Sequence, residues 1–185
     1  QSGHIAAIGF ELYLSMLEEA TEALRAGLAE DDERPEAQVR VDIDVSAYIP
    51  SDFVPYEAAK IELHRRVAAC IEPGEVRGLR EELRDRFGPI PEPVEALLEL
   101  QRVRIEVGRA GGRVAEVRGG RLSISPLELD STGVARIREK LPQALYETSK
   151  RTLSVRVPDE PAPRLAATLG LVDALAGGGD AAPVR

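Results

Sequence analysis

The chain has 185 residues, of which 43% are hydrophobic and 30% are charged, and its net charge is −8. This length and composition suit a folded domain and exclude general disorder. An acidic chain is also poorly suited to binding nucleic acid, because contacts of Lys and Arg with phosphates supply most of that affinity. The one cysteine, Cys70, cannot form an intramolecular disulfide, and no apolar run of about 18 residues suggests a membrane span. We therefore expect a cytoplasmic protein with no membrane partner.

The first 37 residues read as a separate unit. Apolar residues recur at three- and four-residue spacing across residues 10–28, which predicts an amphipathic helix. The acidic segment 30–36 contains Pro35 and has nothing to bury, so we interpret it as a linker and place a domain boundary near residue 37. The chain does not begin with Met and runs directly into an apolar helix, and we expect a fragment of a longer polypeptide.

Residues 39–110 predict one strand followed by three helices. Strict alternation over residues 39–45 indicates a half-buried strand. The first helix covers residues 56–70, and the second ends at Phe87 before Gly88-Pro89. The third begins at Pro91 and ends near Arg109. The inward positions expected on the first of these helices are Ala59, Leu63, Val67 and Cys70.

Residues 113–176 change to the alternating period of strands. Gly119-Gly120 between residues 114–118 and 121–125 predicts a two-residue hairpin, with Val117 opposite Leu122 and Ala115 opposite Ile124. A short helix over residues 132–141, strands over residues 144–148 and 152–157, a last helix around residues 165–175 and a disordered tail at residues 177–185 complete the order. The predicted fold class is α+β: helices packed on a small, mostly antiparallel sheet, preceded by one separate amphipathic helix.

No catalytic or cofactor-binding constellation is evident in the sequence. Glycines and a Lys in the order that cradles phosphates are absent, as is the Gly-x-Ser-x-Gly elbow of a nucleophilic serine. His4, His64 and Cys70 are too few and too badly spaced for a zinc site, and Cys70 reads better as a small core residue. We expect this chain to be neither an enzyme nor a holder of any cofactor or metal.

An arginine-rich stretch leaves two interpretations open. Residues 102–121 contain six arginines against Glu106 and Glu116. Such a stretch is more often a solvated face than a site. The alternative is an accessory module that uses this stretch to contact nucleic acid or RNA polymerase.

Three motifs carry a resemblance to a known family. They are QSGHI at residues 1–5 leading into FELY at residues 10–13, AYIPSDFVP at residues 47–55, and ELRDRFGPIP at residues 82–91. They resemble the bacterial transcription-repair coupling factor (Mfd) family over about residues 1–110. The first motif is similar to the end of the translocase core, in the motif shared with RecG, and the other two are similar to the C-terminal domain. Phe53 and His64 each stand at a position where the family usually has Tyr.

The resemblance implies a regulatory role. The parent is an ATP- and Mg-dependent DNA translocase that displaces stalled RNA polymerase and recruits repair through UvrA. Its C-terminal domain docks on the N-terminal UvrB-like module, masks the UvrA surface and restrains the motor. We expect this chain to be monomeric. We also expect DNA to be bound by the motor of the parent protein and not by this chain.

The resemblance implies that Glu82, Asp85 and Arg86 of the third motif lie at the contact with the UvrB-like module. It also implies that Gln1 and Gly3 belong to the motor-coupling loop. Without the resemblance, Glu82 and Arg86 are an i, i+4 pair on a solvated face, which contributes about 0.3–0.5 kcal/mol. In either case we expect that removing both side chains scarcely alters the melting of the isolated domain.

Overall fold

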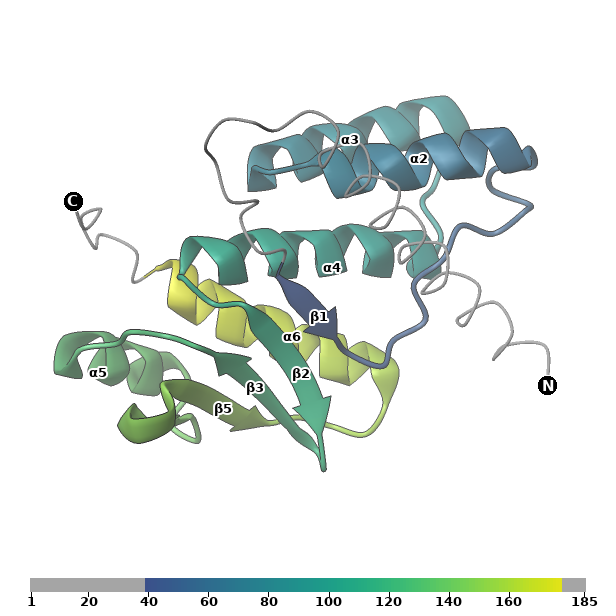
Figure 1. Ribbon diagram of the computed structural model, residues 1–185. Helices are drawn as coiled ribbons and strands as arrows, with labels where there is room; N and C mark the ends of the chain where they lie inside the picture. The colour runs from purple at the N-terminus through teal and green to yellow at the C-terminus, as the bar shows by residue number, and fades with distance from the viewer. Residues whose placement is uncertain (1–38, 178–185) are drawn as a thin grey trace, which may run out of the picture. The chain divides into compact units, whose positions relative to one another are not determined.

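The computed structural model describes residues 39–177, which belong to one folded unit (Figure 1). Its helices are α2 (Glu57–Ala69), α3 (Pro73–Phe87), α4 (Glu92–Arg109), α5 (Ser131–Lys140) and α6 (Pro161–Ala176), with a short 3₁₀ turn at Thr148–Lys150. Its strands are β1 (Arg40–Asp42), β2 (Val114–Arg118), β3 (Arg121–Ser125), β4 (Leu145–Glu147) and β5 (Thr152–Arg156). The predicted helix at residues 10–28, the linker, the boundary near residue 37 and all but the first residue of the predicted tail at 177–185 lie outside the described residues.

The strands form one sheet in the order β1-β2-β3-β5-β4, in which only the β1–β2 pair is parallel. The predicted hairpin is confirmed with its register: Val117 lies opposite Leu122, and Ala115 opposite Ile124. Gly119 and Gly120 both have positive φ, as a tight two-residue turn requires. The predicted α+β class, with a mostly antiparallel sheet, is therefore confirmed.

β1 is shorter than the alternation predicted. Only Arg40–Asp42 pairs with β2, although the inward positions continue to Ile43, which is buried. The Asp44 carbonyl accepts a hydrogen bond from Arg164 Nη1 of α6, at 2.6 Å. A side chain thus takes the place that a strand partner would have occupied, and the chain leaves the sheet there.

The helices of residues 39–177 lie on one face of the sheet. The side chains of Ala115, Leu122, Ile124, Leu153 and Val155 point to this face and are almost fully buried. They pack in one cluster with residues of α4 and α6, which cross the sheet side by side (Figure 1). No helix of residues 39–177 lies on the opposite face of the sheet (Figure 1).

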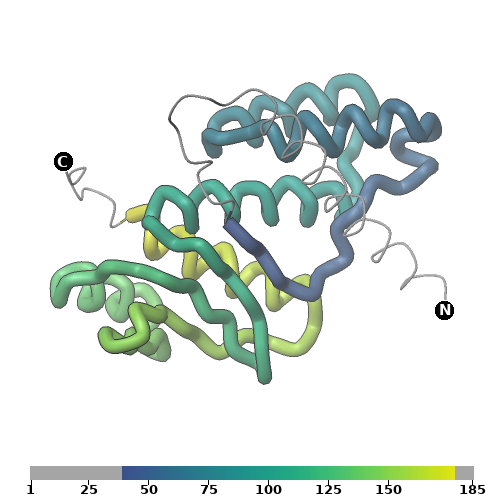
Figure 2. The backbone as a smooth tube through the Cα atoms, viewed as in Figure 1, coloured from purple at the N-terminus to yellow at the C-terminus, as the bar shows by residue number. Residues whose placement is uncertain are grey.

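A further pair of helices, α2 and α3, lies on the side of α4 away from the sheet (Figure 2). Because α4 has neighbours on both sides, eight of its residues are buried, more than in any other helix of residues 39–177. In α2, by contrast, burial is confined to Leu63 and Val67, followed by Cys70 at its C-cap. The expectation that Ala59 faces inward was wrong: it is exposed, one turn before the part of α2 that reaches the core.

Candidate interdomain contact site

The candidate contact residues lie in the second half of α3, a helix with clear start and stop signals. Pro73 occupies the first turn, and Glu72 and Glu75 form a reciprocal capping box that satisfies two backbone N–H groups. Gly88, with φ +84°, ends the helix, and its N–H donates to the Arg84 carbonyl. Residues 82–87 are therefore held on a well-defined helical end.

One stripe of α3 anchors it to the rest of the unit. Val76, Leu79 and Leu83 are buried. Beside them, Arg80 donates to Glu95 at 2.8 Å and to Glu99 at 2.5 Å, both on α4. The stripe and these ion pairs fix which face of α3 is left for other contacts.

Glu82 has a partner on another helix in addition to Arg86. Arg66 of α2 donates from Nη1 and Nη2 to the two carboxylate oxygens of Glu82, at 2.8 and 2.5 Å. Arg86 Nη1 adds the expected i, i+4 contact at 3.1 Å. Because a bidentate pair fixes both partners in orientation, Glu82 joins α2 to α3. The expectation that removing Glu82 and Arg86 leaves melting almost unchanged must therefore be revised towards a loss of stability.

The two arginines strongly favour the ionised form of Glu82. Hydrogen bonds from Arg66 and then Arg86 lower the pKa of Glu82 from its ordinary value of 4.5 to about 2. The same hydrogen bond raises the pKa of Arg66. The α2–α3 link is thus held by full charges at any pH near neutrality.

This low pKa predicts a stability difference that depends on pH. A carboxylate whose folded pKa is depressed stabilises the fold above its unfolded pKa, and that stability is lost as pH falls through the folded pKa. A Glu82→Gln variant should therefore melt below the unsubstituted chain at neutral pH, with the difference shrinking between pH 4.5 and pH 2. Thermal melts followed by circular dichroism across this range measure it, and a Glu81→Gln variant controls for the loss of one carboxylate. A difference that stays constant down to pH 2 would contradict the assignment.

Phe87 is not the buried end of the α3 stripe that its spacing suggests. It remains 37% exposed, and its ring packs at 5.4 Å between centroids against the buried Phe53 of the β1–α2 connection. The Arg86 guanidinium lies over the same ring at 5.3 Å from its centroid. Two of the family-like motifs, AYIPSDFVP and ELRDRFGPIP, therefore meet through Phe53 and Phe87.

Asp85 is the unpaired member of the predicted contact set within residues 39–177. It has no hydrogen bond or ion pair within residues 39–177, whereas Glu82 and Arg86 are paired with each other. The structure thus brings the three predicted contact residues together on one helical end. Gln1 and Gly3 lie outside the described residues, and their role stays a prediction.

The arginine-rich stretch does not form one basic surface. Arg102 pairs with Glu99 and Asp173, and Arg109 pairs with Glu72. Arg104 donates to the Val39 carbonyl at 3.1 Å, and Arg113 is engaged as well. These four lie on α4 and the turn after it. Arg118 and Arg121 lie on β2 and β3, where they point away from the helices.

Gln101, a buried amide that the sequence reasoning did not single out, supports the same region. Its Nε2 donates to the Cys70 carbonyl at 2.8 Å, and its Oε1 accepts from Arg104 Nη1, also at 2.8 Å. It thereby closes the C-terminal end of α2, the helix that carries Arg66. The signal was a polar residue four positions after Leu97, on the inward face that the apolar residues of α4 otherwise occupy. Cys70 itself is buried, as predicted, and burial raises the pKa of its thiol.

Within the described part of the chain, no group of three or more His, Cys, Asp or Glu side chains is arranged to hold a metal ion. No helix between residues 39 and 177 has both the length and the apolar composition needed to cross a membrane. What the geometry does provide is a charged and aromatic helical end that is rigidly supported from two sides.

Comparison with known proteins supports the resemblance on residues 43–137, which match the model of the TRCF domain family. Transcription-repair-coupling factors of Mycobacterium bovis and Mycobacterium tuberculosis are each 34% identical over 167 residues, covering 85% of this chain and 14% of theirs. The Escherichia coli protein of that name is 33% identical over 117 residues, covering 63% of this chain and 10% of its own. The similarity therefore extends past residue 110, the limit of the resemblance inferred from the motifs, but this chain spans only a small part of these relatives.

The fold agrees with the sequence matches. A crystal structure of the C-terminal domain of transcription-repair coupling factor superposes with a TM-score of 0.66, covering 77% of this chain and 94% of that one, at 20% identity. At that identity the likeness shows the shared fold. The family match, the relatives and the fold agree, and the chain belongs to the TRCF domain family.

Proposed function

We propose that this chain is the regulatory docking domain of a transcription-repair coupling factor. In this proposal the end of α3 binds the N-terminal UvrB-like module of the same protein. Docking masks the surface that UvrA needs and restrains the ATP-driven translocase that displaces stalled RNA polymerase. The domain itself binds no cofactor and acts in the bacterial cytoplasm, and ATP, Mg²⁺ and DNA are bound by the motor domains of the parent.

The observation that supports this function best is the state of the α3 end. Asp85 is exposed and unpaired within residues 39–177, beside the exposed Arg86 and the partly exposed Phe87. Carboxylate, guanidinium and aromatic groups together resemble the anchors of protein–protein interfaces, where Arg and aromatic side chains are enriched. A partner surface that presents an arginine and an apolar contact would complement this end.

Glu82 contributes differently from Asp85. Arg66 and Arg86 already hold its carboxylate in one orientation, so little conformational entropy is lost when a partner meets this face. Arg66 and Arg86 offset the charge of Glu82, so the carboxylate of Asp85, one turn away, is the group offered to an approaching basic surface.

The test uses the full-length parent protein with Asp85→Ala. Removing one partner of a desolvated charge pair typically costs about 2–5 kcal/mol, so release of the clamp should raise UvrA affinity at least about tenfold and raise basal ATPase activity. Titration of labelled UvrA measures the first effect. Asp85 has no partner within the described residues, so the substitution should not lower the melting temperature of the 185-residue chain by itself.

A matched control is Glu139→Ala, which removes an exposed carboxylate from α5. It should leave both UvrA affinity and ATPase activity unchanged. If Asp85→Ala behaves like this control, and Arg86→Ala does too, the α3 end is not the docking site.

The nucleic-acid alternative receives less support. Four of the six arginines of residues 102–121 are engaged on or just after α4, and the chain is acidic overall. We expect DNA binding by this chain no tighter than about 10⁻⁴–10⁻⁶ M at physiological salt, the range of non-specific binding. A salt-tolerant, sub-micromolar complex with duplex DNA in a titration would favour the alternative instead.

A further inference from the structure

Three arginines form a row across the face of the sheet opposite α4 and α6. Arg118 of β2 lies opposite Arg121 of β3, and Arg121 lies opposite Arg156 of β5. The next residues along these strands, Val117, Leu122 and Val155, point into the core. Because side chains alternate between the two faces, all three arginines point to the outer face.

The hairpin turn and the end of β5 hold this row together. Gly119-Gly120 makes Arg118 and Arg121 the pair that closes the turn, and Val157 N–H donates to the Gly120 carbonyl at 3.0 Å. Two strand spacings separate the outer members, so the row is about 10 Å wide at the backbone. Arg156 follows Arg121 by 35 positions, so the row cannot be read from the arginine-rich stretch.

The row carries more positive charge than its neighbours balance. Within residues 39–177, Arg118 is the only one of the three with an acidic partner, Glu116, at 2.9 Å. Arg121 donates to the Ser154 hydroxyl at 3.0 Å, and the exposed Arg156 has no ion pair within residues 39–177. Like charges directly opposite each other destabilise a sheet. Since the row does not stabilise the sheet, we take binding of an external anion as the better explanation for it than a structural role.

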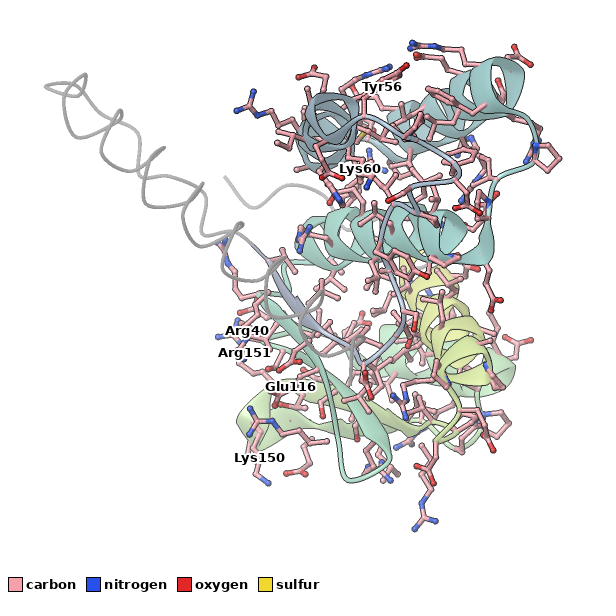
Figure 3. The ribbon with its side chains drawn as sticks, turned by 90° about the vertical axis from the view of Figure 1, so that its right-hand side faces the viewer. Arg40, Tyr56, Lys60, Glu116, Lys150 and Arg151 are labelled. Atoms are coloured by element: carbon pink, nitrogen blue, oxygen red, sulfur yellow. The ribbon has the colours of Figure 1, made fainter. Side chains whose placement is uncertain are left out.

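The neighbouring row on the same face limits what that anion can be. Asp42, Glu116, Ser123 and Ser154 follow in register across β1, β2, β3 and β5. Figure 3 shows Arg40 and Glu116 on the side of the sheet away from α6. The outward residues of these four strands include no aromatic ring on which a base could stack. A polyanion running along the strands from the arginine row would meet the carboxylates of Asp42 and Glu116.

We propose that the arginine row of Arg118, Arg121 and Arg156 binds a short acidic segment of a protein. Guanidinium groups bind carboxylates through paired, planar hydrogen bonds, and the hydroxyls of Ser123 and Ser154 can bond the backbone of such a segment. A segment with two or three carboxylates matches a row of about 10 Å. The acidic second row and the net charge of −8 disfavour a longer nucleic-acid strand. This surface is separate from the α3 end, since α4 and the sheet lie between them (Figure 1).

The test measures binding of a fluorescein-labelled hexaglutamate peptide to the 185-residue chain by fluorescence anisotropy. At about 10 mM ionic strength, where the Debye length is about 30 Å, binding should be detectable and should weaken as salt is raised. An Arg121→Gln, Arg156→Gln double variant should bind about tenfold more weakly, and Arg156→Gln alone about threefold. The control, Arg65→Gln with Arg77→Gln on α2 and α3, changes the net charge equally and should alter binding less than about twofold.

Melting temperatures of the variants exclude unfolding as the cause, because removing opposed arginines should not lower the stability of the sheet. Three outcomes would overturn the proposal. They are no binding of the peptide at low salt, an equal loss in the two double variants, and tighter binding of a labelled hexathymidylate through the same two arginines. The last would assign the row to nucleic acid.

Discussion

Replacing Gly112 by alanine should lower the free energy of unfolding by about 1–3 kcal/mol, the usual cost of overpacking a core. A Cβ atom at this position would lie 2.7 Å from Val107 Cγ1, 3.0 Å from the Val107 carbonyl oxygen and 3.2 Å from Ile124 Cγ2. Val107 is fully buried in α4, and its branched side chain has one strongly preferred rotamer in a helix. Neither neighbour can yield without shifting α4 against β2 and β3. Urea unfolding followed by circular dichroism measures the loss.

Gly78→Ala is the matched control for this substitution. Gly78 lies in the interior of α3, and a Cβ atom there would meet nothing within 4 Å. Alanine should therefore stabilise the chain by about 0.5–1 kcal/mol, because glycine is the poorer helix former. If both variants have the same stability, the contact between the end of α4 and the start of β2 is looser than these distances indicate.

The hairpin shows where local sequence was sufficient. Two glycines between two alternating segments specify both the turn and the register, because a slip of one residue would expose every buried side chain. The ends of α3 and α4 were also predictable, since Gly88 and Gly111 supply the positive φ that stops a helix. These features depend on neighbours in the sequence, and periodicity captures them.

Features that depend on distant contacts were not predictable in the same way. The length of β1 is set by Arg164, 120 positions away from Asp44, whose carbonyl it binds. The exposure of Ala59 follows from where α2 leaves the core, which the spacing of its apolar residues does not reveal. Predicting such features requires knowing how whole helices pack against the sheet.

In the candidate site, too, the local features were predictable from the sequence and the contacts between distant residues were not. The motif ELRDRFGPIP located Glu82, Asp85 and Arg86 on one helix, and the i, i+4 spacing predicted the Glu82–Arg86 contact. The stronger partner of Glu82 is Arg66, 16 positions earlier on α2, and no spacing rule joins residues on different helices. The arginine row on the sheet is a similar case, because Arg156 reaches it only through the pairing of β3 with β5.

Gln101→Leu should lower the free energy of unfolding by about 1–3 kcal/mol, the cost of leaving a buried polar group without a partner. Leucine is also buried readily at an inward helical position, so the change isolates the hydrogen bonds from packing volume. The Cys70 carbonyl would lose the donor that lies 2.8 Å away, at the end of α2. Chemical denaturation measures the loss, and Gln143→Leu, at an exposed position before β4, is the control.

The same Gln101→Leu variant should also change the α3 site from a distance. If the end of α2 opens more often, Arg66 holds Glu82 for less of the time, and the pKa of Glu82 should rise from about 2 towards its ordinary value of 4.5. Hydrogen exchange of the α2 amides measures the opening, and carboxyl carbon NMR shifts across a pH titration measure the pKa. Faster exchange in α2 with no rise in the pKa would mean that Arg86 alone suffices to hold the carboxylate. No change in either would show that Gln101 does not secure α2, and the rigidity of the α3 end would then depend on the buried stripe of Val76, Leu79 and Leu83.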